Sequence, residues 1–402
     1  MAIDLKGARK RPEILLLLMA TATPLAFSVW QALLNNFAVE RAAFTGVEMG
    51  ILQSIREVPG FLSFAVVFLL LVMREQRLAF LSLLLLGIGT AVTGLFPSVV
   101  GLLVTTMIMS VGFHYYETVQ QSLALQWLDR KTAAQWLGRF AAAGSFAAIA
   151  AYGLTSLSFR VLELDYVWIY AIGGGATIVI AVLCWTMFPT FHAKVPQRKQ
   201  LVFRSRYWLY YGLVFMSGAR RQIFLVFATF MLVERFKFDA SEIPLIFLVG
   251  SACNMVLAPR IGRLIDRWGE RPALTIEAVS LIVIFLGYAV VDNRWAAAGL
   301  YVLDFVFFAM AIAIKTYFQK IGDPADIAPT AGVSFTINHI AAVILPFALG
   351  FLWVISPTAV FVAGSGFAVV SLILSRLVPA DPGPGRESLS FRRFRPAATA
   401  AE

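Results

Sequence analysis

The sequence has 402 residues and a formal net charge of +10; hydrophobic residues make up 59% of it and charged residues only 14%. Soluble proteins average about 45–50% apolar and about 25% charged residues, so the composition excludes a water-soluble globular fold. Because a membrane-spanning helix needs roughly 20 apolar residues, the chain has room for about twelve of them.

Short polar turns separate the apolar runs and predict an all-α membrane protein with twelve transmembrane helices. We expect these helices at 12–36, 47–73, 78–97, 99–128, 134–157, 166–189, 207–233, 243–261, 272–291, 295–319, 330–354 and 357–378.

The basic residues indicate the orientation of these helices. If both termini are cytoplasmic, five of the 33 Lys and Arg residues lie outside and three lie within helices, which leaves 25 on the cytoplasmic side. The outer five are Arg41, Arg160, Arg235, Lys237 and Arg294, and the helical three are Arg56, Arg220 and Arg221. This asymmetry is the positive-inside bias of membrane proteins. The positive charge therefore predicts membrane orientation and not a nucleic-acid surface.

From this pattern we expect a multi-pass protein of the plasma membrane, or of the inner membrane if the source is bacterial. Its expected partners are the lipid bilayer, a small-molecule substrate and protons, with no nucleic acid, and we expect a monomer. Cys184 and Cys253 both fall within helices and indicate no disulfide framework.

The N-terminus allows a second interpretation. Basic residues from Lys6 to Arg11 precede an apolar run that contains Ala20-Thr21-Ala22, a pattern also compatible with a cleaved signal peptide. An internal repeat favours a retained helix, because it makes this segment the counterpart of a later one.

The repeat emerges when the chain is shifted against itself by 194 residues. The shift aligns Val39-Glu40-Arg41 with Val233-Glu234-Arg235 and Asp129 with Asp323 without a gap. Such polar turn residues would not coincide by chance apolar matching. We therefore expect a six-helix bundle at 12–189, a basic cytoplasmic linker at 190–206, a second bundle at 207–378 and a disordered cytoplasmic tail at 379–402.

One polar turn between helices carries a motif. The segment GRLIDRWGERPAL, residues 262–274, resembles the G-x-L-x-D-R-x-G-x-R-x-x-L signature of the major facilitator superfamily at Gly262, Leu264, Asp266, Arg267, Gly269, Arg271 and Leu274. The resemblance implies a secondary transporter whose two halves are parallel repeats. It also implies a cytoplasmic gate formed by Gly262, Asp266, Arg267, Gly269 and Arg271.

The first half departs from this signature. Its equivalent turn, Met73-Arg74-Glu75-Gln76-Arg77, keeps only the last Arg, so the resemblance implies that Asp266 and Arg267 carry the charge latch alone. The segment 141–153 also lacks the Gly-Pro pair of many drug-exporting relatives, which weakens an export function.

Two adjacent arginines stand out within the predicted helices. Arg220 and Arg221 lie well inside the helix at 207–233, and a charge at mid-membrane costs about 2.5–3.5 kcal/mol on insertion scales. A guanidinium offers a bidentate fork to a carboxylate or phosphate. We therefore expect at least one of them to bind an anionic group of the substrate; the alternative is that both form interhelical pairs.

A polar stripe marks the helix at 99–128. His114, Glu117 and Gln121 fall at i, i+3 and i+7 and so share one face. The family resemblance implies that the first, fourth, seventh and tenth helices line a central cavity. Glu117 is our first choice for a protonatable coupling residue, and a structural pair with Arg220 or Arg221 is the alternative.

Weaker candidates complete the set. Glu57, beside Arg56, and Asp304 are further candidates for proton coupling, and the remaining candidates for substrate contact are Gln31, Asn35, Asn338 and His339. A buried histidine such as His339 is alternatively an interhelical bridge.

No catalytic signature is present, because the sequence lacks a Walker loop, a C-x-x-C pair and an H-E-x-x-H motif. Gly173-Gly174-Gly175 lies within a predicted helix and favours close helix packing over nucleotide binding. We therefore expect no enzyme activity, no catalytic residues, no cofactor and no resident metal.

The sequence thus predicts a transporter that moves an organic anion or zwitterion by alternating access, coupled to protons, in a direction left open. An alternative is transport of a transition metal or its chelate through His114, Glu117 and His339, although the two arginines would repel a bare cation. A further alternative is a non-transporting receptor or assembly factor on the same scaffold.

Overall fold

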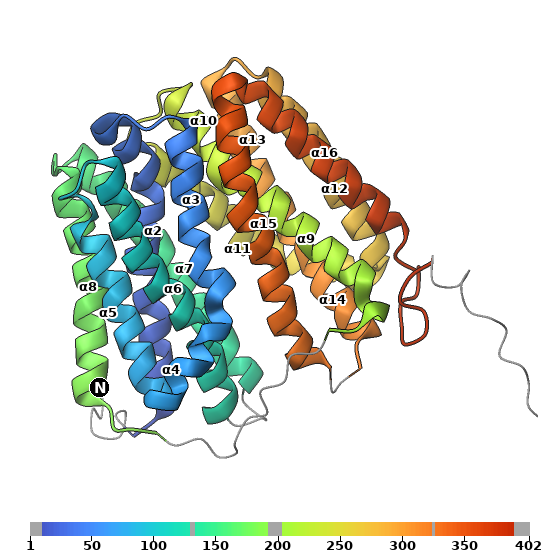
Figure 1. Ribbon diagram of the computed structural model, residues 1–402, viewed down its shortest axis with the longest axis horizontal. Coiled ribbons are helices and arrows are strands. Elements are labelled where there is room, and N and C mark those ends of the chain that lie inside the picture. The colour runs from blue at the N-terminus through green and yellow to red at the C-terminus, as the bar shows by residue number, and fades with distance from the viewer. Residues whose placement is uncertain (1–9, 129–132, 192–202, 324–325, 390–402) are drawn as a thin grey trace, which may run out of the picture. The chain divides into compact units, whose positions relative to one another are not determined.

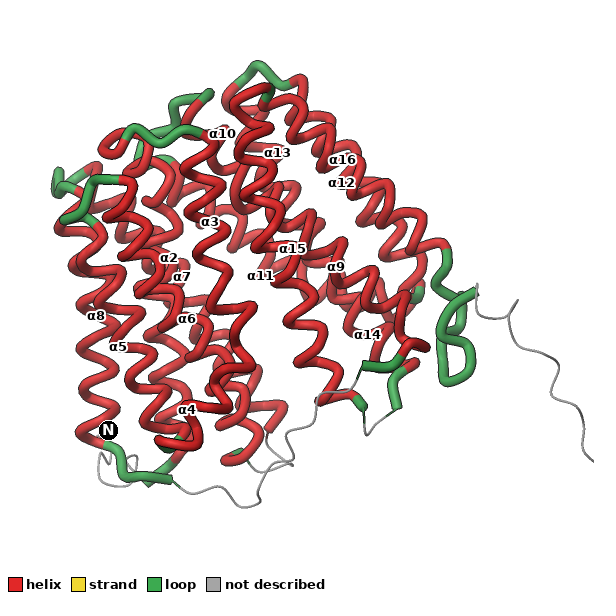
Figure 2. The backbone as a smooth tube through the Cα atoms, viewed as in Figure 1, coloured by secondary structure: helices red, strands yellow, loops and turns green. Residues whose placement is uncertain are grey.

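The computed structural model describes residues 10–128, 133–191, 203–323 and 326–389. Within these ranges the chain forms helices joined by short loops, and Figure 2 shows no strand in them. The one pairing of extended backbone there is an isolated bridge between Gly383 and Arg386. The expected all-α fold is confirmed.

The chain divides into two compact units, which we describe separately. Unit 1 consists of Met1–Arg198 with Phe230–Ser251, and unit 2 consists of Lys199–Thr229 with Ala252–Glu402. The expected second bundle, 207–378, includes a segment that groups here with unit 1.

Contacts inside unit 1 explain why that segment groups there. The Asn36 side-chain amide donates to the carbonyl of Phe238 at 2.7 Å, and the rings of Tyr152 and Phe247 meet edge to face with centroids 5.6 Å apart. Both contacts join the segment to helices near the start of the chain.

Unit 1 is a bundle of long helices. They are α2 (Pro12–Ala42), α3 (Gly46–Phe61), the 3₁₀ turn η1 (Leu62–Ala65), α4 (Val66–Val72), α5 (Glu75–Thr93), α6 (Val99–Trp127), α7 (Ala133–Arg160) and α8 (Tyr166–Met187), with most of α10 (Thr229–Glu234) and the beginning of α11 (Ile243–Trp268). As Figure 1 shows, α5 lies between α6 and α8; α2 packs against α7 and α8, and α3 packs against α6.

Unit 2 repeats this plan. It holds η2 (Ser205–Tyr207), α9 (Trp208–Gln222), the π-helix η3 (Ile223–Ala228), the rest of α11, α12 (Glu270–Val290), α13 (Arg294–Phe308), η4 (Ala309–Ala311), α14 (Ile312–Ile321), α15 (Ile327–Ile355) and α16 (Pro357–Arg376). Here α12 packs against α13 and α16, and α9 packs against α15 and α16.

Helix ends support the duplication. Shifting α6 by 194 residues gives 293–321, and the α13–η4–α14 helix runs from Arg294 to Ile321. Shifting α7 gives 327–354, and α15 runs from Ile327 to Ile355. The packing partners correspond as well, since α5 meets α8 as α12 meets α16. The two units are therefore built on one six-helix plan.

The count of candidate spans is lower than the twelve predicted. Among the described residues, ten helices are long and apolar enough to cross a membrane, and an eleventh appears if the two arms of α11, bent by 48°, count as one span. The predicted span at 47–73 is interrupted by η1 after Pro59, and it carries Arg56 and Glu57. Its helical pieces are too short and too charged to pass that test of length and composition.

Helix beginnings follow from local sequence. Thr45 caps α3 by accepting from the N–H of Val47, while Glu48 accepts from the Thr45 N–H at 2.9 Å, which completes a capping box. Ser98 and Asn293 cap α6 and α13 through the same type of side-chain acceptor.

The glycine run in α8 is explained by helix packing at two of its three positions. A Cβ on Gly173 would lie 2.8 Å from the Val29 side chain, and one on Gly174 would collide with the Gly87 carbonyl oxygen of α5. Gly175 has open space instead, because a Cβ placed there would meet no atom within 4 Å.

The predicted disordered tail needs correction over its first part. Residues 379–389 fold back on unit 2: the Tyr317 hydroxyl donates to the carbonyl of Glu387, and the Leu389 N–H donates to the carbonyl of Leu377 at 3.0 Å. Hydrogen bonds to α14 and to the end of α16 therefore order this stretch. Residues 390–402 lie outside the described residues, as do 192–202 of the predicted linker.

Candidate functional site

A buried ion pair lies in α3 of unit 1. Arg56 and Glu57 contact each other through Nη2 and Oε1, and their side chains are only 7% and 3% exposed. The Arg56 guanidinium also lies over the Trp30 ring, 5.8 Å from its centroid, and the Ser110 hydroxyl donates to the Arg56 carbonyl. The two charges thus compensate each other in a setting closed to solvent.

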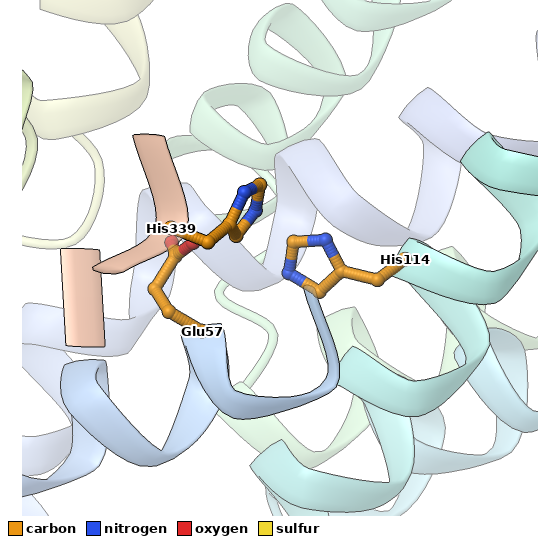
Figure 3. Close-up of side chains that lie close together, drawn as sticks. All are labelled: Glu57, His114 and His339. Carbon is orange, nitrogen blue, oxygen red and sulfur yellow. The ribbon is translucent and has the colours of Figure 1, made fainter. Parts of the chain in front are cut away.

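Beside this pair lies the predicted polar stripe of α6. Figure 3 shows Glu57 and His114 reaching from α3 and α6 into the same space, with ligand atoms within 4.8 Å of each other. His114 is buried and its Nδ1 lies 3.9 Å from Glu117 Oε2, whereas the Glu117 side chain is 45% exposed and Gln121 is exposed. The stripe therefore runs from a buried imidazole to an exposed carboxylate and amide.

The candidates on α2 differ from one another in burial. Gln31 is half-buried, while Asn35 is buried and its Oδ1 has no hydrogen-bond partner among the described residues. The neighbouring Asn36 donates to the Phe238 carbonyl and to Glu40 Oε1 at 3.4 Å, which gives it a structural role.

In unit 2 the first predicted arginine has a carboxylate partner that sequence reasoning missed. Arg220 Nη1 of α9 lies 3.2 Å from Glu277 Oε1 of α12, with side chains 3% and 1% exposed. Glu277 stands alone inside an apolar helix, which is the same signal that singled out Asp304. The interhelical pair, the alternative interpretation of the two arginines, is thus present for Arg220.

Asp304 of α13 joins this pair. It is 1% exposed, it interacts electrostatically with Arg220 and Glu277, and neither of its oxygens has a hydrogen-bond partner among the described residues. Tyr288 of α12 also interacts electrostatically with it. Two buried carboxyl groups therefore lie near one guanidinium.

The backbone changes just past the arginines. Arg221 is half-buried, one residue and hence about 100° around α9 from Arg220. The helix then continues as the π-helix η3, a geometry that is rare and frequent at functional sites. Nothing in the local sequence IFLVFA predicts it.

The candidates on α15 lie against α9 or their own helix. The Asn338 amide donates to the Val214 carbonyl at 3.4 Å where Gly218 allows a close approach of the two helices. His339 is buried; its Nδ1 lies 2.8 Å from the Phe335 carbonyl, and its ring lies 4.1 Å from the Phe335 ring.

The motif turn is shorter than the sequence indicates. Helix α11 continues through Gly262, Asp266 and Arg267 to Trp268, and only Gly269, with φ 86°, separates it from α12. This left-handed backbone explains the glycine. Arg271 already lies inside α12.

Near the motif turn, helix ends of unit 2 are joined by charge contacts outside the predicted gate. Glu270, the first residue of α12, is buried and lies 2.8 Å from Lys320 Nζ of α14. Asp326 accepts from Arg204 at 2.9 Å and from the Tyr207 hydroxyl at 3.0 Å. Hydrogen bonding from Arg204 holds the pKa of the Asp326 carboxyl below its ordinary value.

Unit 1 has its own polar contact at the turn that lost the motif. Glu75, the first residue of α5, accepts from Gln126 at 2.6 Å and from Ser122 at 3.3 Å, both on α6. Gln76 donates to the Pro189 carbonyl at 2.9 Å and so holds the end of α8.

Comparisons with known proteins agree with this architecture. The family model described as Major Facilitator Superfamily matches residues 14–346. A search of curated proteins finds no match.

Solved structures share the fold at low identity. A mutant of the nucleoside transporter NupG has a TM-score of 0.76 at 15% identity, covering 91% of this chain and 99% of that one. A bacterial homolog of the human lysosomal transporter Spinster, in an inward-facing and occupied conformation, has a TM-score of 0.72 at 14% identity, covering 94% and 97%. Identities this low speak for the fold alone. The family match over most of the chain shows that it belongs to the major facilitator superfamily and is a membrane transporter, not an enzyme.

Proposed function

We propose that this transporter moves a small organic anion or zwitterion by alternating access and couples its movement to protons. The observation that carries the proposal is the group formed by Arg220, Glu277 and Asp304. Each lies in a different candidate membrane span of unit 2, and all three are buried.

Charged side chains in a membrane span are costly, and they mark substrate or proton pathways. Arg220 already holds a carboxylate, so its surroundings suit a carboxylate ligand. A substrate anion would replace Glu277 as its partner, and the adjacent Arg221 would offer a second guanidinium. This exchange is the proposed means of binding.

Proton coupling is proposed for the carboxyl groups of both units. In unit 1, Glu57 and Glu117 both lie close to His114, whose ring nitrogens can donate or accept a proton. In unit 2 the corresponding group is Asp304. Each of these acids lies next to a cationic or titratable partner.

The other polar candidates complete the proposal. Gln121, Gln31, Asn35, Asn338 and His339 would contact the solute, and the residues of the motif turn, Gly262, Asp266, Arg267, Gly269 and Arg271, would form the cytoplasmic gate. We place both termini in the cytoplasm, with a monomeric protein in the plasma membrane, or in the inner membrane if the source is bacterial.

The test is uptake into proteoliposomes with an imposed pH gradient. A panel of carboxylates, amino acids and nucleosides is screened first, since one relative of similar fold is a nucleoside transporter. Arg220→Gln and Arg221→Gln should then each be assayed for the accumulated compound. Unchanged uptake in both variants would contradict anion binding.

The proton step is tested separately. Glu57→Gln, Glu117→Gln and Asp304→Asn should reduce gradient-driven accumulation, whereas Glu163→Gln, which removes an exposed loop carboxylate, should not. Accumulation that follows the gradient equally in all four variants would refute coupling through these acids.

A transition metal is the second candidate substrate, because the ligand atoms of Glu57 and His114 are within 4.8 Å of each other. The Arg56 guanidinium on Glu57 opposes a bare cation there. Adding Mn²⁺ and Zn²⁺ to the same screen separates the two proposals.

A further inference from the structure

The buried group in unit 2 contains more acidic than basic side chains. Arg220 supplies one positive charge, and Glu277 and Asp304 supply up to two negative charges. A guanidinium stays protonated in proteins, whereas a carboxyl group can take up a proton. The group is neutral only if one of the two acids carries a proton. An uncompensated charge inside a membrane span is expensive, so we expect the neutral form.

The contacts distinguish the acid that faces the arginine from the acid that does not. Glu277 faces Arg220 at 3.2 Å, while neither oxygen of Asp304 is hydrogen-bonded to any described residue. Among the described residues, the groups that interact electrostatically with Asp304 are Arg220 from α9 and Glu277 and Tyr288 from α12. Arg220 is the single cation among these groups, and it is in contact with Glu277.

The structure gives one close atom pair between Arg220 and Glu277. Although Nη1 and Oε1 lie 3.2 Å apart, both atoms lack a partner with hydrogen-bond geometry among the described residues. A charge contact without an aligned hydrogen bond is weaker than a bidentate pair between an arginine and a carboxylate.

The internal repeat shows that the fold does not need these charges. The shift of 194 residues places Ala26, Leu83 and Ser110 of unit 1 at the positions of Arg220, Glu277 and Asp304. All three are buried, and α5 packs against α6 and α8 as α12 packs against α13 and α16. A six-helix unit is therefore built without the charged group, which points to a function for it.

We propose that Glu277 and Asp304 compete for Arg220 and share one proton, which makes them a proton-binding site of unit 2. The proton resides on whichever carboxyl group lacks the arginine: on Asp304 in this structure, and on Glu277 when Arg220 turns toward α13. An anion that displaced Glu277 from Arg220 would leave both acids neutral and would thus bring in one further proton. This inference deepens the proposed coupling and rests on it only for the link to transport.

Infrared spectroscopy of the protein reconstituted in lipid at neutral pH tests the shared proton without a substrate. A protonated carboxyl group has a carbonyl stretch that an ionised carboxylate lacks. Asp304→Asn and Glu277→Gln should each remove one such band from the wild-type spectrum, because one acid and one arginine then remain and balance. Arg220→Gln should double the band, because both acids are then neutral.

Controls separate the site from other acids and from misfolding. Glu163→Gln should leave the band unchanged. The triple variant R220A/E277L/D304S carries the unit 1 residues, and it should remain monodisperse and lack the band. If Asp304→Asn retained the full band, the proposed proton site would be overturned. If Glu277→Gln retained the full band, competition of the two acids for Arg220 would be overturned. Transport measurements enter neither outcome, so failure of the proposed function remains distinguishable.

Discussion

Replacing Glu57 with Gln should destabilise unit 1 more than replacing Arg56 does. Both side chains are buried, so Glu57→Gln leaves a guanidinium without its carboxylate and without water. Removing one partner of a buried pair costs about 3–5 kcal/mol. The Trp30 ring, 5.8 Å from the guanidinium, offsets about 0.5–2 kcal/mol through a cation–π contact, which favours the lower end of that range.

The destabilisation caused by the opposite variant, Arg56→Gln, should depend on pH. In Arg56→Gln the remaining Glu57 can be neutralised by a proton, whereas the arginine of Glu57→Gln cannot lose its own. Each unit of acidification can therefore return up to about 1.4 kcal/mol to Arg56→Gln until the acid is neutral. The stability of Glu57→Gln relative to the wild type should not recover in this way.

The assay is the temperature at which the purified protein loses its monodisperse peak in size-exclusion chromatography, measured from neutral to mildly acidic pH. A loss of about 3 kcal/mol corresponds to a shift of several degrees. The matched control is R56M/E57M, because an uncharged pair of similar size is often neutral for stability. Equal, pH-independent losses in both single variants, or a double variant as unstable as Glu57→Gln, would refute this reasoning.

Two further predictions concern folding. Asp326 has a lowered pKa, so its contribution to stability is complete above the ordinary pKa of an aspartate, about 3.9, and is lost as pH falls through the lower folded value. Asp326→Asn should therefore reduce the loss of stability at acidic pH, measured by fluorescence-monitored unfolding over a pH series. An unchanged acid dependence of stability would contradict this prediction. Gly174→Val should lower the free energy of unfolding by about 1–3 kcal/mol, because it overpacks α8 against α5. Gly175→Val places its side chain in open space and should leave the melting temperature unchanged. Equal effects of the two variants would exclude helix contact as the cause.

Sequence reasoning predicted what depends on composition and period. The apolar runs, the repeat and the motif turn were sufficient for the fold class and for the family. They could not show where a helix breaks without ending, as at η1 or η3, because hydropathy does not register a change of hydrogen-bond pattern. The motif turn was misjudged for the same reason: its charged residues continue α11 up to Gly269.

The candidate site shows the same division. Isolated charges in apolar helices were visible in the sequence; Arg220, Glu57, His114 and Asp304 are buried, whereas the Glu117 side chain is 45% exposed. Their partners were not visible, because Arg220 and Glu277 are distant in sequence and meet only in the folded chain. Glu277 carried the same signal and was overlooked, so Arg220 seemed available for a substrate when the fold had already given it a carboxylate.

The turn before α5 lacks the motif carried by the turn before α12, yet both turns contact a neighbouring helix. In both units the first residue of a helix is a glutamate, Glu75 of α5 and Glu270 of α12, where the helix dipole favours an anion. Each reaches the end of a neighbouring helix through Gln126 or Lys320, residues that the 194-residue shift superimposes. In unit 1 this helix–helix contact is thus a hydrogen bond from a neutral amide, and in unit 2 it is an ion pair. Because the Lys320 side chain is 49% exposed, salt should weaken that ion pair and leave the amide hydrogen bond intact, so the asymmetry between the halves lies in charge and not in connectivity.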